Sequence, residues 1–216
     1  MLSPERIAQT ALDLAGAEGF GAVTMQRLGR ELGVTARALY NHVADRQEVI
    51  DLVASLMLRR TPQPRFDAED WRESLADAYH RARDAYRSFP RATLISLDET
   101  VTDTEVDPVR ITMTEQMLEF LVGVGLTLEQ AVVMRTGFLL DVFGFVLLVD
   151  YGYDRLDPET RELRAQPVPQ PWLDAHPDVA APLSRKAAQL PPSTSDEGFR
   201  AVIESRIALI EHLLEG

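Results

Sequence analysis

The sequence predicts an all-α protein, and two observations carry this prediction. Thirteen prolines leave long spans free of proline, namely 5–61, 65–89, 91–107, 109–157 and 193–216. Proline ends helices and rarely sits inside them, and no span shows the sustained period-two alternation of a half-buried strand. Residues 158–192, which hold eight prolines, are expected to form short helical pieces joined by loops.

The composition is that of a globular chain with unevenly distributed charge. The net charge is −12 and there is no cysteine, which excludes a disulfide framework, a thiolate metal site and a cysteine nucleophile. Residues 1–60 hold seven arginines and seven acids, so the acid excess lies in 61–216. The most apolar stretch, 131–149, contains Arg135 and Asp141, which are costly in lipid. With no apolar leader at the N-terminus, we expect a cytoplasmic protein without a membrane span.

Capping chemistry predicts four helices in the first 60 residues. Each begins after a side chain that can accept a hydrogen bond from the first turn: Ser3, Thr24, Thr35 and Asp45. Pro4 suits the first position of a helix, Gly33 supplies a left-handed stop, and Glu48 completes a capping-box variant. Short helices joined by such tight turns form a helix-turn-helix.

The third of these helices, expected over 35–43, exposes groups suited to reading DNA bases. At 100° per residue, Leu39 and Val43 face inward, whereas Arg37 and Asn41 point outward. Arginine binds guanine and asparagine binds adenine through paired hydrogen bonds in the major groove. Flanking phosphates are expected to meet residues at the starts of the neighbouring helices: Thr24, Gln26 and Arg46. A solvated polar face is the plain alternative, but the capped three-helix spacing favours DNA binding.

The stretch from Glu5 to Leu58, with Leu32–Val34 and Leu39–Val43 as its "LGV…LYNHV" segment, resembles the DNA-binding domain of TetR-family transcriptional regulators. This resemblance implies a homodimer on palindromic double-stranded DNA. The expected interface consists of Thr24, Gln26, Thr35, Ala36, Arg37, Ala38, Tyr40, Asn41, His42 and Arg46. Packing against the fourth helix is the alternative for His42, and the net charge of +2 over Thr24–Arg46 is low for phosphate binding.

Two apolar stripes at helical spacing follow in the second half of the chain. They are Trp71, Leu75, Ala78, Tyr79, Ala82, Tyr86 and Phe89, and then Met113, Met117 and Phe120. Such stripes usually form a core. They are pocket candidates here because small Ala78 and Ala82 leave room opposite flexible methionines.

The segments "W71RESL", "F89PRA", "G125LTLEQA" and "F143GFVLL" resemble the C-terminal regulatory domain of the tetracycline repressor subgroup. In those repressors a histidine, two amides, an aromatic residue and the partner subunit's glutamate hold the drug and magnesium. The matching positions here are Ile95 or Ser96 for the histidine, Ala78 and Met117 for the amides, Ala82 for the aromatic residue and Leu148 for the glutamate. None of these side chains binds magnesium, so the resemblance implies an effector bound without a metal or cofactor.

The expected effector is a small, largely apolar or aromatic molecule. Its predicted site contains Ala78, Tyr79, Ala82, Tyr86, Ser96, Met113, Met117, Phe138, Asp141 and Leu148. Few polar groups remain to orient a ligand, the candidates being Ser96, His80, Arg135 and Asp141. Arg135 and Asp141 could equally pair with each other or face a second subunit.

Two apolar helices are expected to form the dimer interface that the resemblance implies. Residues 128–149 are apolar nearly all round from Val132 onward. The final helix, for which Ser195 is the expected cap, adds Phe199, Val202, Ile203, Ile210, Leu213 and Leu214. The alternative is that these helices only close the core of one subunit. The predicted organisation is a DNA-binding domain over 1–46, a connecting helix and linker over 47–64, and a ligand-binding and dimerisation domain over 65–216.

The sequence therefore favours a ligand-responsive transcriptional regulator. We expect a repressor that its effector releases from the operator. Two alternatives stay open: a DNA-binding dimer that senses nothing, and an all-α enzyme. An enzyme would have to use Asp77 with His80, or the acids between residues 98 and 107. The chain has no Glu-x-x-His pair for a di-metal bundle and no GxSxG, P-loop or HExxH motif, so no catalytic activity is expected.

Overall fold

The computed structural model describes residues 1–61, 63–95, 99, 107–166 and 168–215, and every regular element in that part of the chain is a helix. The all-α prediction is confirmed. In chain order the elements are α1 (Pro4–Glu18), η1 (Phe20–Ala22), α2 (Met25–Leu32), α3 (Ala36–Leu39), α4 (Arg46–Arg60), α5 (Trp71–Arg87), η2 (Pro90–Leu94), α7 (Pro108–Val124), α8 (Leu128–Phe145), η4 (Val146–Asp150), α9 (Tyr151–Arg155), α10 (Pro158–Ala165), α11 (Gln170–Ala175), α12 (Pro182–Ala187) and α13 (Ser195–Glu215).

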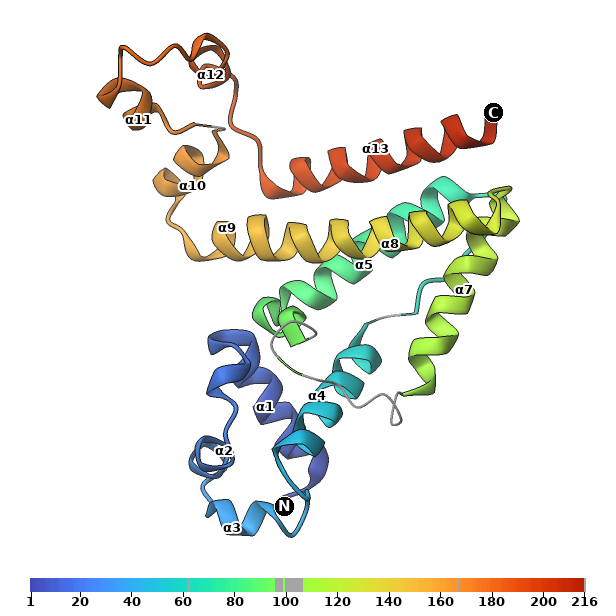
Figure 1. The fold of residues 1–216 in the computed structure, drawn as a ribbon, viewed down its shortest axis with the longest axis vertical. Helices are drawn as coiled ribbons and strands as arrows, with labels where there is room; N and C mark the ends of the chain where they lie inside the picture. The colour runs from blue at the N-terminus through green and yellow to red at the C-terminus, as the bar shows by residue number, and fades with distance from the viewer. Residues whose placement is uncertain (62, 96–98, 100–106, 167, 216) are drawn as a thin grey trace.

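The molecule consists of a small helical end joined to a larger helical body (Figure 1). α1, α2 and α3 form the small end, and α4 runs from it toward the body. α5, α8 and α13 lie across the far end, while α7 descends from them toward α4. The proline-rich segment forms an arm with α10, α11 and α12, as its composition predicts, and this arm projects between α9 and α13.

Local hydrogen bonds fix the helices of the small end where the sequence predicts them. The cap side chains accept from backbone N–H groups three residues on, at 3.3 Å for Ser3, 3.1 Å for Thr24, 3.2 Å for Thr35 and 3.0 Å for Asp45. Gly33 ends α2 with a φ of 71°, in the left-handed region that favours glycine. The Glu48 carboxylate accepts from the N–H of Ala44, next to the cap.

α4 shares its core with α1. Fully buried apolar side chains join the four helices, among them Ile7, Leu12, Leu28, Leu39, Val49 and Ile50. The predicted division after residue 46 therefore separates two helices that pack against each other.

α3 is shorter than the predicted helix over 35–43, and this expectation is corrected. The α-helix ends at Leu39, and residues 40–42 form turns in which the N–H of His42 donates to the Leu39 carbonyl at 2.8 Å. The reason is geometric, because Asp45 already caps α4 and the chain must turn before it. Leu39 and Val43 are nevertheless buried as predicted.

α8 continues without a break through the wide π turn of η4 into α9. This helix, Leu128–Arg155, is long and apolar enough to cross a membrane by length and composition alone. The two charges in its apolar middle are engaged inside the protein: Arg135 donates to the Thr114 hydroxyl at 3.0 Å, and Asp141 accepts from Arg206 of α13 at 2.9 Å. Arg135 and Asp141 are thus not paired with each other.

The cap of α13 is Thr194, and the expectation that Ser195 caps this helix is wrong. The Thr194 hydroxyl accepts from the N–H of Glu197 at 3.2 Å, and the Glu197 carboxylate accepts from the N–H of Thr194 at 2.7 Å. Ser195 is buried instead, and its hydroxyl oxygen accepts a hydrogen bond from Arg83 at 2.9 Å.

A buried ion pair ties the body together. Arg83 of α5 and Asp150 at the end of η4 are 3% and 0% exposed, and the guanidinium donates to both carboxylate oxygens at 2.8 and 2.7 Å. Asp196 lies 2.8 Å from the same guanidinium. Burial lowers the pKa of Arg83, but the hydrogen bonds to Asp150 and Asp196 outweigh it and raise the pKa. One cation therefore connects α5, the α8 helix and α13.

Asp150→Asn is expected to destabilise the fold by about 3 kcal/mol, because it leaves the buried Arg83 cation with only the exposed Asp196 as a counterion. Asp154→Asn is the matched control: Asp154 pairs with Arg87 at a side-chain exposure of 42%, so its loss costs about 1 kcal/mol or less. Urea unfolding followed by circular dichroism at one protein concentration measures both. Equal losses for the two variants would contradict the assigned role of Arg83.

Candidate functional site

The outer surface of α2 and α3 presents the residues that the sequence predicts to meet DNA. Gln26, Arg37, Tyr40 and Asn41 are exposed, with Tyr40 at 53%. Ala36, Ala38 and His42 are half-buried, and the exposed Thr24 and Thr35 use their hydroxyl oxygens as caps. The exposed groups of α3 and the turn after it are thus an arginine, a phenol and an amide, and α3 lies at the tip of the molecule (Figure 1).

A glycine sets the close approach of α3 to α2. A Cβ atom at Gly29 would lie 2.9 Å from the backbone oxygen of Val34 and 3.0 Å from the backbone nitrogen of Ala36. Both neighbours are main-chain atoms at the start of α3, so they cannot move aside cheaply. Gly29 therefore fixes where α3 sits on α2.

Positive charge at this surface is more limited than the sequence suggests. Arg27 forms ion pairs with Glu18 at 3.0 Å and with Glu31 at 2.7 Å. Arg30 and Arg37 are exposed and form no ion pair within the part of the chain that the structure describes.

Arg46 binds other parts of the fold while 36% of its side chain is exposed, and its expected phosphate contact stays a prediction. Its guanidinium donates to the backbone oxygens of Val23 at 2.7 Å and Phe20 at 3.1 Å, and to the Glu99 carboxylate at 2.8 Å. Hydrogen bonds to Glu99 raise the pKa of Arg46. These bonds tie the start of α4 to the segment that follows η2, so Arg46 has a structural role.

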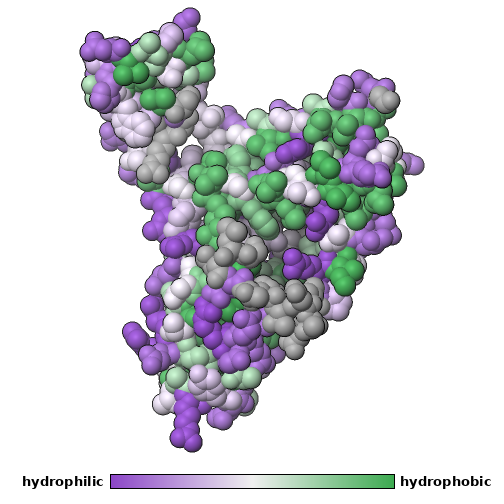
Figure 2. Space-filling model, in the orientation of Figure 1, coloured by the Kyte–Doolittle hydropathy of each residue, from purple (hydrophilic) through white to green (hydrophobic). Residues whose placement is uncertain are grey.

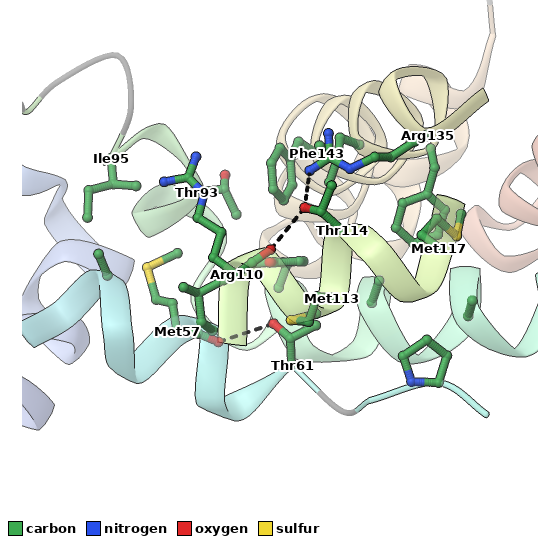
Figure 3. A pocket seen from close by; sticks show the side chains of 18 of the residues that line it. Met57, Thr61, Thr93, Ile95, Arg110, Met113, Thr114, Met117, Arg135 and Phe143 are labelled. Carbon is green, nitrogen blue, oxygen red and sulfur yellow. Dashed lines mark hydrogen bonds between the residues drawn. The ribbon is translucent and has the colours of Figure 1, made fainter. Parts of the chain in front are cut away.

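A cavity of about 240 Å³ lies where α4, α5, α7 and α8 meet. Figure 3 shows its lining from close by. By helix, the lining includes Met57 and Leu58 of α4 with Thr61 just after it, Ala78, Ala82 and Tyr86 of α5, Arg110, Met113, Thr114 and Met117 of α7, and Arg135, Phe138, Leu139 and Phe143 of α8, with Thr93 and Ile95 at one end.

Six predicted pocket residues lie on this lining: Ala78, Ala82, Tyr86, Met113, Met117 and Phe138. Five of them share the cavity side of α5 and α7, because residues three and four apart share a helix face, and Phe138 comes from α8. Their contact with a ligand stays a prediction. Ser96 lies outside the described residues.

Three other predicted pocket residues do not line the cavity. Tyr79 is 1% exposed, and its hydroxyl donates to Asp141 at 2.8 Å. Tyr79 is the residue after Ala78, so its side chain points about 100° around the helix from that of Ala78 and away from the cavity. Asp141 is also directed away from the cavity, because Arg206 binds its carboxylate at 2.5 Å. Leu148 is 85% exposed on the outside of the long helix.

Sequence reasoning missed the contribution of α4 and much of the polar lining. Met57, Leu58 and Thr61 come from a helix and linker expected only to connect two domains. Arg110 and Thr114, one turn apart on α7, precede the recognised methionines by three residues each and could have been found from that spacing.

The cavity is chiefly apolar, and its described lining holds neither a histidine nor a carboxylate. Burial raises the pKa of Tyr86, while a hydrogen bond with Thr61 and the charge of Arg110 act in the opposite direction. Tyr86 is therefore a neutral phenol at physiological pH.

Threonine and tyrosine hydroxyls are poor substitutes for the carboxylates and waters that hold Mg²⁺, so these residues do not fit the drug–magnesium complex of tetracycline repressors. No metal-binding group of three or more histidines or acids occurs among the described residues.

The groups considered for catalysis are used structurally where the structure describes them. Asp77 forms an ion pair with Arg81 at 2.5 Å. His80 is exposed, and the centre of its ring lies 5.9 Å from the centre of the Phe199 ring. Glu99 and Asp107 pair with arginines of α4, and most of the acid run between them lies outside the described residues.

A helix-turn-helix with an outward reading face, joined to a helical body that contains an apolar cavity, defines the class of helix-turn-helix transcriptional regulators. Comparison with known families agrees: residues 7–52 match "Bacterial regulatory proteins, tetR family", and residues 63–210 match "Tetracyclin repressor-like, C-terminal domain". The chain belongs to the TetR family of transcriptional regulators.

Individual relatives are more distant. The HTH-type transcriptional repressor DrrR1 of Streptomyces coeruleorubidus is 26% identical over 144 residues, covering 64% of this chain and 52% of DrrR1. The class C tetracycline repressor protein of Escherichia coli is 36% identical over 95 residues, or 42% and 43% of the two chains. The chain thus matches about half the length of these curated relatives.

Solved structures share the whole fold. ActR of Streptomyces coelicolor in complex with actinorhodin superposes with a TM-score of 0.77 at 24% identity over 100% of both chains. TetR of Acinetobacter baumannii superposes with a TM-score of 0.65 at 21% identity over 99% of both chains.

Proposed function

We propose that this regulator is a cytoplasmic repressor that binds a palindromic operator as a homodimer and leaves it when a largely apolar, aromatic molecule enters the cavity without a metal. One observation carries the proposal: α4 lines the cavity through Met57 and Leu58 and packs through Val49 and Ile50 in the core it shares with α1. A ligand that moves α4 therefore acts on the helix that supports α2 and α3.

The energy required for such release is modest. A ligand lowers operator affinity only by its preference for the arrangement that does not fit DNA, and a tenfold loss corresponds to about 1.4 kcal/mol. Repositioning one contact such as Met57 against an aromatic ligand is of this order, since a sulfur–aromatic contact contributes about 0.3–1.5 kcal/mol.

Dimerisation is supported by an exposed apolar stripe on the long helix. Val133, Leu140 and Leu148 are 61%, 68% and 85% exposed, and their spacing of seven and eight residues puts them on one side of the helix. α13 lies beside α8 (Figure 1), and its exposed Ala201 and Ala208 allow close approach of another helix. Figure 2 shows apolar side chains gathered over the body and polar ones at the opposite tip.

Arg37→Ala is expected to weaken operator binding by about 1–3 kcal/mol and to relax the base preference at one position of each half-site. The operator is first obtained by sequencing the genomic fragments that the protein retains, and fluorescence anisotropy then measures affinity. Arg81→Ala, which removes an arginine from the body, should leave binding unchanged. An Arg37→Ala protein that binds as tightly as wild type would refute the role of Arg37.

Leu140→Glu is expected to shift the protein from dimer to monomer and to weaken binding to the full palindrome, because it places a charge in the apolar stripe. The control is Ile111→Glu on α7, where the exposed fraction is 69% against 68% for Leu140. Sedimentation velocity gives the oligomeric state. A wild-type monomer that still binds the palindrome, or equal disruption by Ile111→Glu, would contradict the proposed interface.

Ala82 is the position that tests the effector site, because Ala82→Trp fills the cavity.

 Operator release by aromatic compounds, selected beforehand by thermal shift, should be lost in Ala82→Trp, whereas Ala85→Trp on the same helix but off the lining should behave as wild type. An anisotropy assay on the labelled operator measures release. Equal release from both variants would place the effector elsewhere and favour a DNA-binding dimer whose cavity senses nothing. Release by magnesium–tetracycline that a chelator abolishes would contradict metal-free binding.

A further inference from the structure

We propose that the cavity selects an aromatic anion: a flat apolar ring system that carries a carboxylate, sulfonate or similar acidic group. This inference rests on the proposed effector function and names the class of ligand. It starts from two arginines on the lining, Arg110 of α7 and Arg135 of α8. In Figure 3 the Arg110 side chain reaches toward Thr93, and the Arg135 guanidinium lies beside Thr114 and Phe143.

Neither guanidinium has a carboxylate partner among the residues that the structure describes. Within residues 107–166 and the other described ranges, no carboxylate lies within ion-pair distance of Arg110 or Arg135, and none lines the cavity. The nearby acids have other partners: Asp107, one turn before Arg110, lies 3.0 Å from Arg59, and Glu99 is held by Arg46. The cavity therefore has an excess of positive charge on an otherwise apolar wall.

A hydrogen-bond chain holds Arg135 in place. Its guanidinium donates to the Thr114 hydroxyl at 3.0 Å, and that hydroxyl donates to the backbone oxygen of Arg110 at 2.9 Å. Arg135 thus keeps a fixed direction, with further N–H groups left to donate, since a guanidinium has five.

The plain alternative is that both arginines only extend into solvent. Arg110 is exposed, and for this residue alone the alternative would suffice. Arg135 is half-buried among Phe138, Phe143 and Met113, where an unpaired cation is unfavourable without a compensating anion. The other interior charge of α8, Asp141, already has its counterion in Arg206. An anionic ligand would give Arg135 a counterion, as Arg206 does for Asp141.

The aromatic part of the ligand has its own surfaces. Phe138, Phe143 and Tyr86 line the cavity with Met113 and Met117, and aromatic rings and thioethers pack well on flat apolar groups. The Tyr86 phenol, kept neutral by its raised pKa, can donate a further hydrogen bond to an acidic oxygen.

Two fluorescent compounds with the same ring system test the proposal. 8-Anilinonaphthalene-1-sulfonate carries a negative charge, and N-phenyl-1-naphthylamine is its neutral counterpart. Arg135→Met and Arg110→Met, which keep an unbranched chain of apolar character, are each expected to weaken sulfonate binding about five- to tenfold, tenfold being about 1.4 kcal/mol. Affinity for the neutral amine should change by less than about twofold in the same variants, because this compound carries no negative charge for the arginines to bind. Arg135→Lys, which keeps the charge, should retain part of the affinity.

Two controls assign the signal to the cavity. Ala82→Trp, or Met117→Trp if the first variant does not fold, should abolish binding of both compounds. Arg200→Met, which removes an exposed arginine of α13 away from the lining, should change neither affinity. Raising the salt concentration should weaken sulfonate binding in wild type more than in the Arg110→Met/Arg135→Met double variant, because salt screens charge.

The outcomes separate this inference from the proposed function. Sulfonate binding that depends on the cavity and on both arginines supports the aromatic anion. Sulfonate binding that the double variant keeps in full, but that Ala82→Trp abolishes, overturns the anion proposal and leaves an aromatic effector site intact. Binding of both compounds that survives Ala82→Trp and Met117→Trp overturns the effector site as well.

Discussion

Helix α4 takes part in two packing regions at once, and the rest of the structure depends on this constraint. Its first half contributes Val49, Ile50 and Val53, all fully buried, to the core of the DNA-binding end. Its last turns carry Met57 and Leu58 to the cavity in the body. A close-packed core transmits small displacements because it has few voids to absorb them. A ligand that displaces the end of α4 therefore changes the support of α2 and α3.

Ion pairs and hydrogen bonds between distant segments hold the helices of the body together. Arg83 joins α5, the end of the α8 helix and the start of α13 through a buried ion pair. Near the middle of the same helices, Arg206 and Tyr79 both bind the Asp141 carboxylate. These contacts cross between helices that are far apart in sequence, so the wall of the cavity formed by α5 and α8 is held rigidly against α13.

Two ion pairs connect α4 to the part of the chain between η2 and α7. Arg46 binds Glu99, and Arg59 binds Asp107 at 3.0 Å with its own side chain 52% exposed. The two carboxylates are only 12% and 13% exposed, so both pairs are partly buried. In the proposed response to a ligand, these are the contacts of α4 that would have to shift.

Local chemistry allowed much of this structure to be predicted from the sequence. The caps Thr24, Thr35 and Asp45 act within three residues of themselves, so their roles can be inferred without knowing the fold. The same holds for cavity residues such as Ala82 and Met117, because a helical stripe is a local pattern. The TetR resemblance also supplied the overall architecture, which the fold and the family comparison confirm.

The errors and omissions concern contacts between distant segments. The sequence does not reveal that Arg46 binds Glu99, which lies 53 positions further along the chain. Tyr79 and Asp141 were assigned to the cavity, although Arg206, far along α13, draws both of them into a separate polar cluster. A periodic pattern identifies the buried side of a helix, but it does not reveal which neighbour that side meets.

The central claim, that occupation of the cavity changes how the two DNA-binding ends of a dimer are held, can be measured directly by pulsed electron spin resonance. The chain has no cysteine, so Gln26→Cys in each subunit gives one clean spin-label site at the exposed start of α2. The account predicts a narrow distance distribution on operator DNA, and a shifted or broadened one when free dimer binds an aromatic ligand in the cavity. An Ala82→Trp background should abolish the ligand's effect. An identical distribution with and without ligand, under conditions where the cavity is saturated, would contradict the claim.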